Sequence, residues 1–221
     1  MKRLSSALVA VAVLGACGTS GSKGPRYEQK ALEKAALTAH DVGPTFGRDR
    51  SAEKSKSANK DAYKASKECR QLIDDLSLFG GDQPDEKSKA RVKRVYKDDQ
   101  GRQIEQQMFA GALTVPQVRD LLDKCSKFTY ERAGVRVVVR LDTEDKPGYG
   151  DESFALRIEV KLTAPRNYAL HAYDIVFGRG NAITQVSGFS NIDSQLHEHK
   201  LPDSLIERLA TEADHKLKEA A

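Results

Sequence analysis

The chain has 221 residues, a formal net charge of +4, three cysteines and no tryptophan. Part of the positive charge lies in an N-terminal segment that we expect to be removed, so the slight excess of the mature chain argues against a nucleic-acid-binding protein. With only seven tyrosines and seven phenylalanines, the sequence also argues against a sugar-stacking surface. Its length is enough for one domain with a hydrophobic core and short for two.

The first sixteen residues have the layout of a secretory signal peptide. Lys2 and Arg3 are positive, the run from Leu4 to Leu14 is mostly apolar, and Gly15 and Ala16 are small. A transmembrane helix needs about 20 apolar residues, which this run does not supply. We therefore expect residues 1–16 to be cleaved and the mature chain to work outside the cytoplasm.

Cys17 follows this segment directly. Leu14-Gly15-Ala16-Cys17 resembles a bacterial lipobox, which implies that Cys17 receives a diacylglyceryl group on its sulfur, becomes the new N-terminus and is acylated there, as by palmitate. Two or more acyl chains give a stable membrane anchor. Residues 17–26 then form a flexible tether, and residues 27–221 form a single extracytoplasmic domain at the cell membrane. The alternative is an ordinary secretory cleavage site that happens to precede a cysteine.

The domain begins with helical segments. Periodicity predicts a short helix over Tyr27–Thr38, which Asp41-Val42-Gly43-Pro44 ends. Ser51–Lys60 is either a loop or the solvated start of the helix that carries Cys69. The basic residues of this region are interpreted as a solvated helix face, with a contact to anionic lipids as the alternative. They are Lys54, Lys56, Lys60, Lys64 and Lys67.

Three cysteines leave an even pair once Cys17 is lipidated. Cys69 and Cys125 both lie on helical apolar stripes, and the second of these helices opens with a capping box of Thr114 and Gln117. The stripes are Ala62, Ala65, Cys69, Leu72, Ile73 and Leu76, and Val115, Val118, Leu121, Leu122 and Cys125. We predict a disulfide between Cys69 and Cys125. Two inert buried thiols are the alternative, and a redox pair is disfavoured because no Cys-x-x-Cys spacing occurs.

Alternation of apolar and polar residues predicts strands over much of the remaining chain. They are Ala90–Lys97, Arg102–Ala112, the stretch from Val135 to Asp142, Ser153–Leu162, roughly Tyr168–Phe177, and Ala182–Phe189. A last helix begins near Ser204, which forms a second capping box with Glu207, and it buries an apolar stripe up to Leu217. The fold class is therefore α+β: an antiparallel sheet with helices packed on one face, in a single domain with one disulfide.

No catalytic residue set can be identified. The stretch from Val186 to Ser190 lacks the first glycine of a nucleophile elbow, and Gly178-Arg179-Gly180 fits a hairpin turn rather than a phosphate loop. His197-Glu198-His199 has the wrong spacing for a zinc protease and is interpreted as solvated. A set of acidic residues has carboxylate oxygens that could ligate calcium. We interpret this segment as a solvated turn instead. It comprises Asp142, Glu144, Asp145, Asp151 and Glu152. We predict no metal, no cofactor and no enzymatic activity.

Several segments, in order along the chain, resemble one family. Besides the lipobox and the two cysteines that bracket a hairpin, they are Ala36–Val42, Tyr149–Ser153 and Asp174–Asn181. The chain resembles actinobacterial surface lipoproteins related to the extracellular sensor domain of membrane serine/threonine kinases. The resemblance implies a disulfide-bonded α+β domain with a groove for an unidentified ligand. Those sensor domains usually have two disulfides, whereas only one is expected here. Since neither a transmembrane segment nor a kinase is expected after this domain, a signal is expected to pass through a partner.

The leading hypothesis is a lipid-anchored binding or sensor module that contacts a small ligand or an envelope protein through a groove between sheet and helices. The alternative is a surface hydrolase whose active residues, for example His171 or the acidic turn, meet only in the folded chain. A histidine within hydrogen-bond reach of both a carboxylate and a serine or threonine distinguishes that case. The solute-binding subunit of an importer is disfavoured because such proteins usually have two lobes.

Overall fold

The structure, a computed structural model, describes residues 24–53, 69, 90–111, 113–132, 135–162, 168–193 and 197–221. The predicted signal peptide, the lipidation site at Cys17, most of the tether and the basic residues from Lys54 to Lys67 lie outside these ranges. No helix in the described ranges has the length and apolarity that crossing a bilayer requires.

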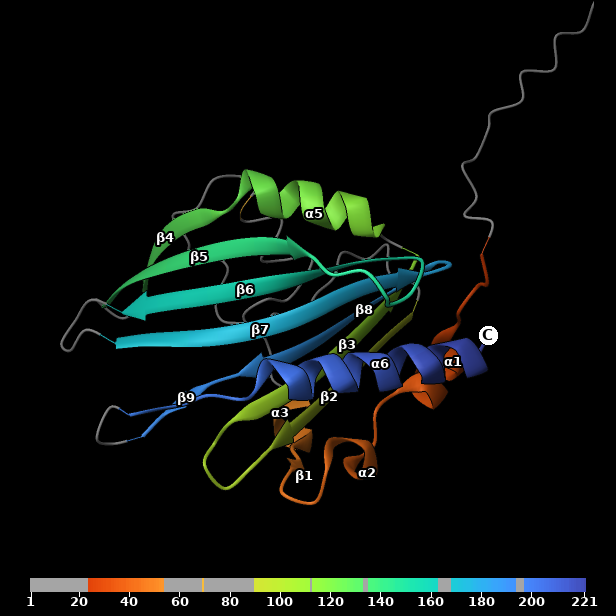
Figure 1. Ribbon diagram of the computed structural model, residues 1–221, viewed down its shortest axis with the longest axis horizontal. Coiled ribbons are helices and arrows are strands. Elements are labelled where there is room, and N and C mark those ends of the chain that lie inside the picture. Colours follow the sequence, from red (N-terminus) through yellow and green to blue (C-terminus); the bar gives the residue numbers. More distant parts are fainter. Residues whose placement is uncertain are drawn as a thin grey trace, which may run out of the picture.

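An eight-stranded antiparallel sheet forms the centre of the domain (Figure 1), in the strand order β1-β2-β3-β8-β7-β6-β5-β4. Its strands are β1 (Gly47–Arg48), β2 (Ala90–Lys97), β3 (Gln103–Ala110), β4 (Lys127–Arg132), β5 (Val135–Asp145), β6 (Glu152–Leu162), β7 (Tyr168–Arg179) and β8 (Ala182–Phe189). The pairing of β3 with β8 joins the hairpin β2–β3 to the later strands. Two short strands beyond β8, β9 (Asn191–Ile192) and β10 (Glu198–His199), pair with each other.

Helices cover both faces of this sheet. They are α1 (Gln29–Ala35), α2 (Ala39–Val42), α3 (Arg50–Glu53), α5 (Val115–Lys124) and α6 (Asp203–Glu219). α6 and α1 pack around a core that includes Ile175 and Leu209, whereas α5 packs around a core that includes Val118 and Val176. The α+β class and the antiparallel sheet are confirmed. The helices, expected on one face, occupy both, because successive residues of the central strands point to opposite faces and are apolar on each.

The two predicted capping boxes have different outcomes. At the start of α5, Gln117 Oε1 accepts a hydrogen bond from the Thr114 backbone N–H at 2.8 Å, as predicted. The box of Ser204 and Glu207 does not form, because α6 begins at Asp203 after Pro202 and Ser204 lies inside the first turn. α6 nevertheless buries the predicted apolar stripe, which includes Ile206, Leu209, Ala213 and Leu217.

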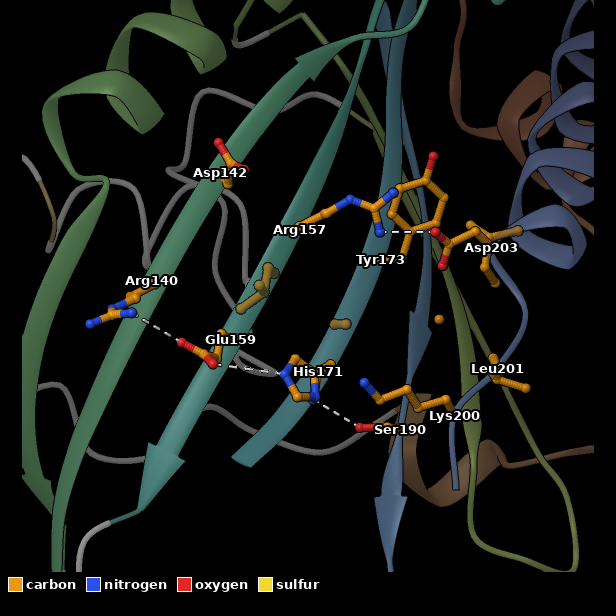
Figure 2. A pocket seen from close by; sticks show the side chains of 14 residues that line it. Arg140, Asp142, Arg157, Glu159, His171, Tyr173, Ser190, Lys200, Leu201 and Asp203 are labelled. Atoms are coloured by element: carbon orange, nitrogen blue, oxygen red, sulfur yellow. Dashed lines mark hydrogen bonds and ion pairs between the residues drawn. The ribbon is translucent and has the colours of Figure 1, made fainter. Parts of the chain in front are cut away.

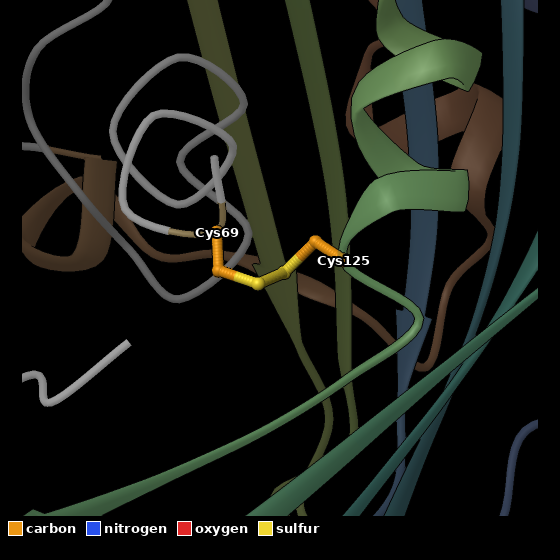
Figure 3. Close-up of a disulfide and its surroundings, with 2 residues drawn as sticks. All are labelled: Cys69 and Cys125. Atoms are coloured by element: carbon orange, nitrogen blue, oxygen red, sulfur yellow. A yellow bond between two sulfur atoms is a disulfide. The ribbon is translucent and has the colours of Figure 1, made fainter. Parts of the chain in front are cut away.

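A disulfide joins Cys69 to Cys125, as predicted (Figure 3). The two Cα atoms are 5.1 Å apart, and 56 positions of the sequence separate the residues. Cys125 lies at the C-terminal end of α5, and both cysteines are buried in the core beneath that helix. The bond therefore ties residue 69 to the α5 face of the sheet.

β4 and the two-residue strands β1, β9 and β10 were not predicted, and one helix is shorter than predicted. β4 pairs with β5 from Lys127 opposite Arg140 onward, so its formation depends on a partner rather than on a clear alternation of its own. The predicted helix over Tyr27–Thr38 is limited to α1, because the backbone becomes extended at Ala36. The short helix α2 then follows, with Thr38 and Asp41 capping it reciprocally.

Candidate functional site

A groove of about 320 Å³ lies on the α6 face of the sheet, beside the N-terminus of α6 (Figure 2). α6 crosses β7 and β8 so closely that a side chain at Gly188 of β8 would meet Ile206 Cδ1 at 2.6 Å. β5 and β6 form the other wall and present charged side chains. The lining includes Arg140, Asp142, Arg157, Glu159, His171, Tyr173, Ser190, Lys200, Leu201, Asp203 and Ile206.

Two rows of side chains run across the strands that form this wall. The strand register places Arg140, Glu159 and His171 side by side in one row, and Asp142, Arg157 and Tyr173 in the next. In the first row, the Arg140 guanidinium lies 3.7 Å from Glu159, and His171 Nε2 lies 3.8 Å from Glu159. Directly opposed residues on one face of an antiparallel pair interact. The register therefore creates a charged surface from residues on three strands.

His171 joins this surface to the pair of strands beyond β8. Its Nδ1 lies 2.7 Å from Glu198 Oε1, on β10. The Ser190 hydroxyl accepts a hydrogen bond from the His171 backbone N–H at 2.9 Å. Burial alone would raise the pKa of Glu198, but hydrogen bonds from Ser190 and His171 and the nearby positive charge of Lys200 lower it.

These contacts bear on the hydrolase alternative. Both ring nitrogens of His171 face carboxylates, Glu198 and Glu159. The described hydrogen bonds of the Ser190 hydroxyl go to the His171 backbone and to Glu198. A nucleophilic serine requires its hydroxyl at the imidazole that accepts its proton. The described contacts therefore join His171, Ser190 and the two carboxylates into one cluster at the groove.

Arg157 and Tyr173 form the centre of the groove. The Arg157 guanidinium lies over the Tyr173 ring, with its Cζ atom 4.6 Å from the ring centroid, and donates a hydrogen bond to Asp203 at 2.8 Å. The Tyr173 hydroxyl donates to Glu207 at 3.1 Å. Burial raises the pKa of Tyr173 to about 12, with Lys146 opposing the shift and Glu207 adding to it. Tyr173 is therefore a neutral donor near pH 7.

The other residues considered as site candidates in the sequence lie apart from one another in the structure. His197 and His199 both lie beside Asp193, at 3.5 and 3.1 Å, while Glu198 between them turns to His171. Of the acidic group, Asp142 lies in the groove, Asp145 pairs with Arg119 of α5, and Asp151 accepts from the Gly180 backbone N–H. These carboxylates do not converge.

The turn at Gly178-Arg179-Gly180 has a structural role. Gly180 has a φ of 57°, as the prediction of a glycine turn requires. A Cβ atom there would lie 2.1 Å from the Pro25 carbonyl oxygen. Arg179 donates two hydrogen bonds to Asp214 of α6, at 2.9 and 3.1 Å. The turn therefore fixes the C-terminal part of α6 to the sheet.

Sequence reasoning missed a buried polar cluster under α5. Asp174 of β7 is fully buried, and its Oδ2 accepts from Gln185 Nε2 at 2.7 Å. Its Oδ1 has no hydrogen-bond partner among the residues that the structure describes. Burial raises the pKa of Asp174 to about 7, while hydrogen bonds from Gln185 and Ser187 oppose the shift and Glu105 adds to it. The available signal was an acidic residue between Ala172 and Val176, at an inward-facing position of an apolar strand.

Comparisons with known proteins support the fold. No family model and no curated protein sequence matches the chain. Among solved structures, the extracellular domain of PknH from Mycobacterium tuberculosis is similar, with a TM-score of 0.55 and 8% sequence identity. The similarity covers 89% of this chain and 99% of the PknH domain. This chain therefore shares the fold of the extracellular domain of a mycobacterial kinase.

Proposed function

We propose that this chain is a lipid-anchored extracytoplasmic lipoprotein that acts as a ligand-binding or sensor module at the cell envelope, without catalysis. The observation that carries the proposal is the open groove beside α6, whose wall of charged side chains is held by the strand register. Protein sites for small molecules are concave and combine apolar surface with a few placed polar groups. The shared fold with the PknH extracellular domain supports a sensor role.

The anchor is the second part of the proposal. The lipobox at Leu14–Cys17 places a lipid on Cys17, and a short tether holds the domain near the membrane surface. A ligand signal would then reach the cell through an envelope protein. No nucleic acid partner is proposed.

Ligand binding is tested by the melting temperature of the full chain in the presence of envelope lipids and of soluble cell-wall fragments. A ligand that binds only the folded state raises that temperature. Lys200→Trp places an indole at the groove rim, where the lysine side chain is 61% exposed. Lys124→Trp is the matched control, because Lys124 is 56% exposed on α5, across the sheet.

We expect a fraction that raises the melting temperature of the wild type and of Lys124→Trp but not of Lys200→Trp. If every fraction leaves the wild type unchanged, or if Lys200→Trp responds as the wild type does, the groove is not the binding site. The anchor is tested separately by mass spectrometry of Cys17 and by detergent partitioning of Cys17→Ala. An unacylated Cys17 in the wild type, or one bonded to another cysteine, contradicts the anchor.

A further inference from the structure

The charges that line the groove are balanced. Three carboxylates, those of Asp142, Glu159 and Asp203, face three basic groups, those of Arg140, Arg157 and Lys200. A strongly anionic ligand would meet the three carboxylates, and a strongly cationic ligand would meet the three basic groups. Since like charges brought together at a binding site exclude the wrong partners, the lining favours a ligand without net charge.

The centre of the groove is closed to one class of neutral ligand. Tyr173 is the aromatic residue of the lining, and the Arg157 guanidinium already lies over its ring. Its hydroxyl donates a hydrogen bond to Glu207. A sugar that stacks on an aromatic ring therefore finds this ring covered.

Two neighbouring groups of opposite charge retain binding capacity. Asp142 and Arg157 are opposite each other on β5 and β6. Asp142 is exposed and makes no hydrogen bond or ion pair within the described ranges. Arg157 donates one hydrogen bond to Asp203, which leaves most of its five N–H donors. Opposed side chains on adjacent strands have Cβ atoms about 5 Å apart. The Arg157 guanidinium is directed away from β5, toward Tyr173 and Asp203 (Figure 2), so a ligand that reaches both groups spans the space between its head and Asp142.

Apolar surface lies on the α6 side of the groove (Figure 2). Leu201 is partly exposed where the chain enters α6, and the buried side chain of Ile206 packs behind it over Gly188. The volume of about 320 Å³ is at the lower end of the range for small-molecule pockets. A small ligand with one apolar group therefore suits the site.

We propose that the groove binds a zwitterion with an apolar side chain, namely an amino acid or a short peptide. Its carboxylate is bound by Arg157, its ammonium group by Asp142, and its side chain by Leu201. This inference rests on the proposed function, because it names the ligand class of the same groove. Charge-assisted hydrogen bonds of this kind are stronger than those between neutral groups.

The inference is tested by isothermal titration calorimetry of the full chain at pH 7 with four probes. They are leucine, leucyl-leucine, N-acetyl-leucyl-leucine and leucyl-leucine amide. We expect binding of one or both zwitterions and at least tenfold weaker binding of the two blocked peptides, since each lacks one charge. The relative affinities for leucine and leucyl-leucine show whether the ligand is an amino acid or a peptide.

Asp142→Asn should weaken binding of the zwitterion about tenfold, which corresponds to about 1.4 kcal/mol. Glu152→Gln is the matched control, because Glu152 is also an exposed carboxylate but lies on the α5 face of β6 and should leave affinity unchanged. Equal affinities for blocked and unblocked peptides would overturn the proposal of a zwitterionic ligand. An Asp142→Asn variant that binds as tightly as the wild type would overturn it too. No heat with any probe would also overturn it. The groove itself is judged independently by the envelope fractions and Lys200→Trp.

Discussion

Replacing Asp174 by asparagine should change how the stability of the protein depends on pH. Asp174 has an ordinary pKa of 3.8 and is raised to about 7 by burial. The folded protein therefore holds a proton on Asp174 at pH values where the unfolded chain has lost it. Because the folded pKa is raised, this stabilisation is present at low pH and is lost as pH rises from about 4 to 7. A shift of three units corresponds to about 4 kcal/mol in total.

Asparagine keeps an oxygen acceptor for Gln185 and cannot ionise. The free energy of unfolding of the wild type, measured by urea denaturation followed by circular dichroism, should therefore fall relative to Asp174→Asn by about 2.5 kcal/mol between pH 5 and pH 8. The pKa of Glu105 is also raised, mainly by burial, but Glu105 is present in both proteins and largely cancels in the difference. A difference between the two proteins that stays constant from pH 5 to pH 8 would refute the reasoning.

Three further predictions concern stability, each measured by urea denaturation at pH 7. Replacing both Cys69 and Cys125 by serine should lower the free energy of unfolding by about 4 kcal/mol, as chain entropy predicts for a loop of 56 positions; an unchanged midpoint contradicts it. Asp214→Ala should cost about 3 kcal/mol, because it leaves Arg179 without its two hydrogen bonds, and a loss below 1 kcal/mol opposes that role. Leu217→Ala should cost about 3 kcal/mol, because Leu217 is fully buried; a loss no greater than for an exposed position argues against this core.

Much of the fold could be predicted because its signals are local. The alternation in Ser153–Leu162 places Phe154, Leu156 and Ile158 on one face, and all three are buried under α5. The pairing of Cys69 with Cys125 followed from the parity of the cysteines and from their apolar stripes. β4 escaped prediction because its hydrogen bonds are made to β5, and a strand that depends on its neighbour has a weak pattern of its own.

The groove depends on contacts that no local pattern contains. Alternation placed Arg140 and Arg157 on polar strand faces, but it did not state that β5 and β6 are neighbours in a register that sets Arg157 beside Asp142. It also did not state that α6 would leave this part of the sheet uncovered. Asp174 is a similar case, because its burial follows from α5 and the adjacent strands rather than from its own segment.

The sequence by itself determined the periodic elements, the α+β class, the single disulfide and the expectation of a lipid anchor at Cys17. Side-chain direction repeats every two residues in a strand and every 3.6 in a helix, so each segment carries this information alone. Only the tertiary structure decided that helices occupy both faces, which charges meet in the groove and which carboxyl is fully buried. These depend on pairing between residues far apart in the chain, and that pairing is fixed when the whole core is buried together.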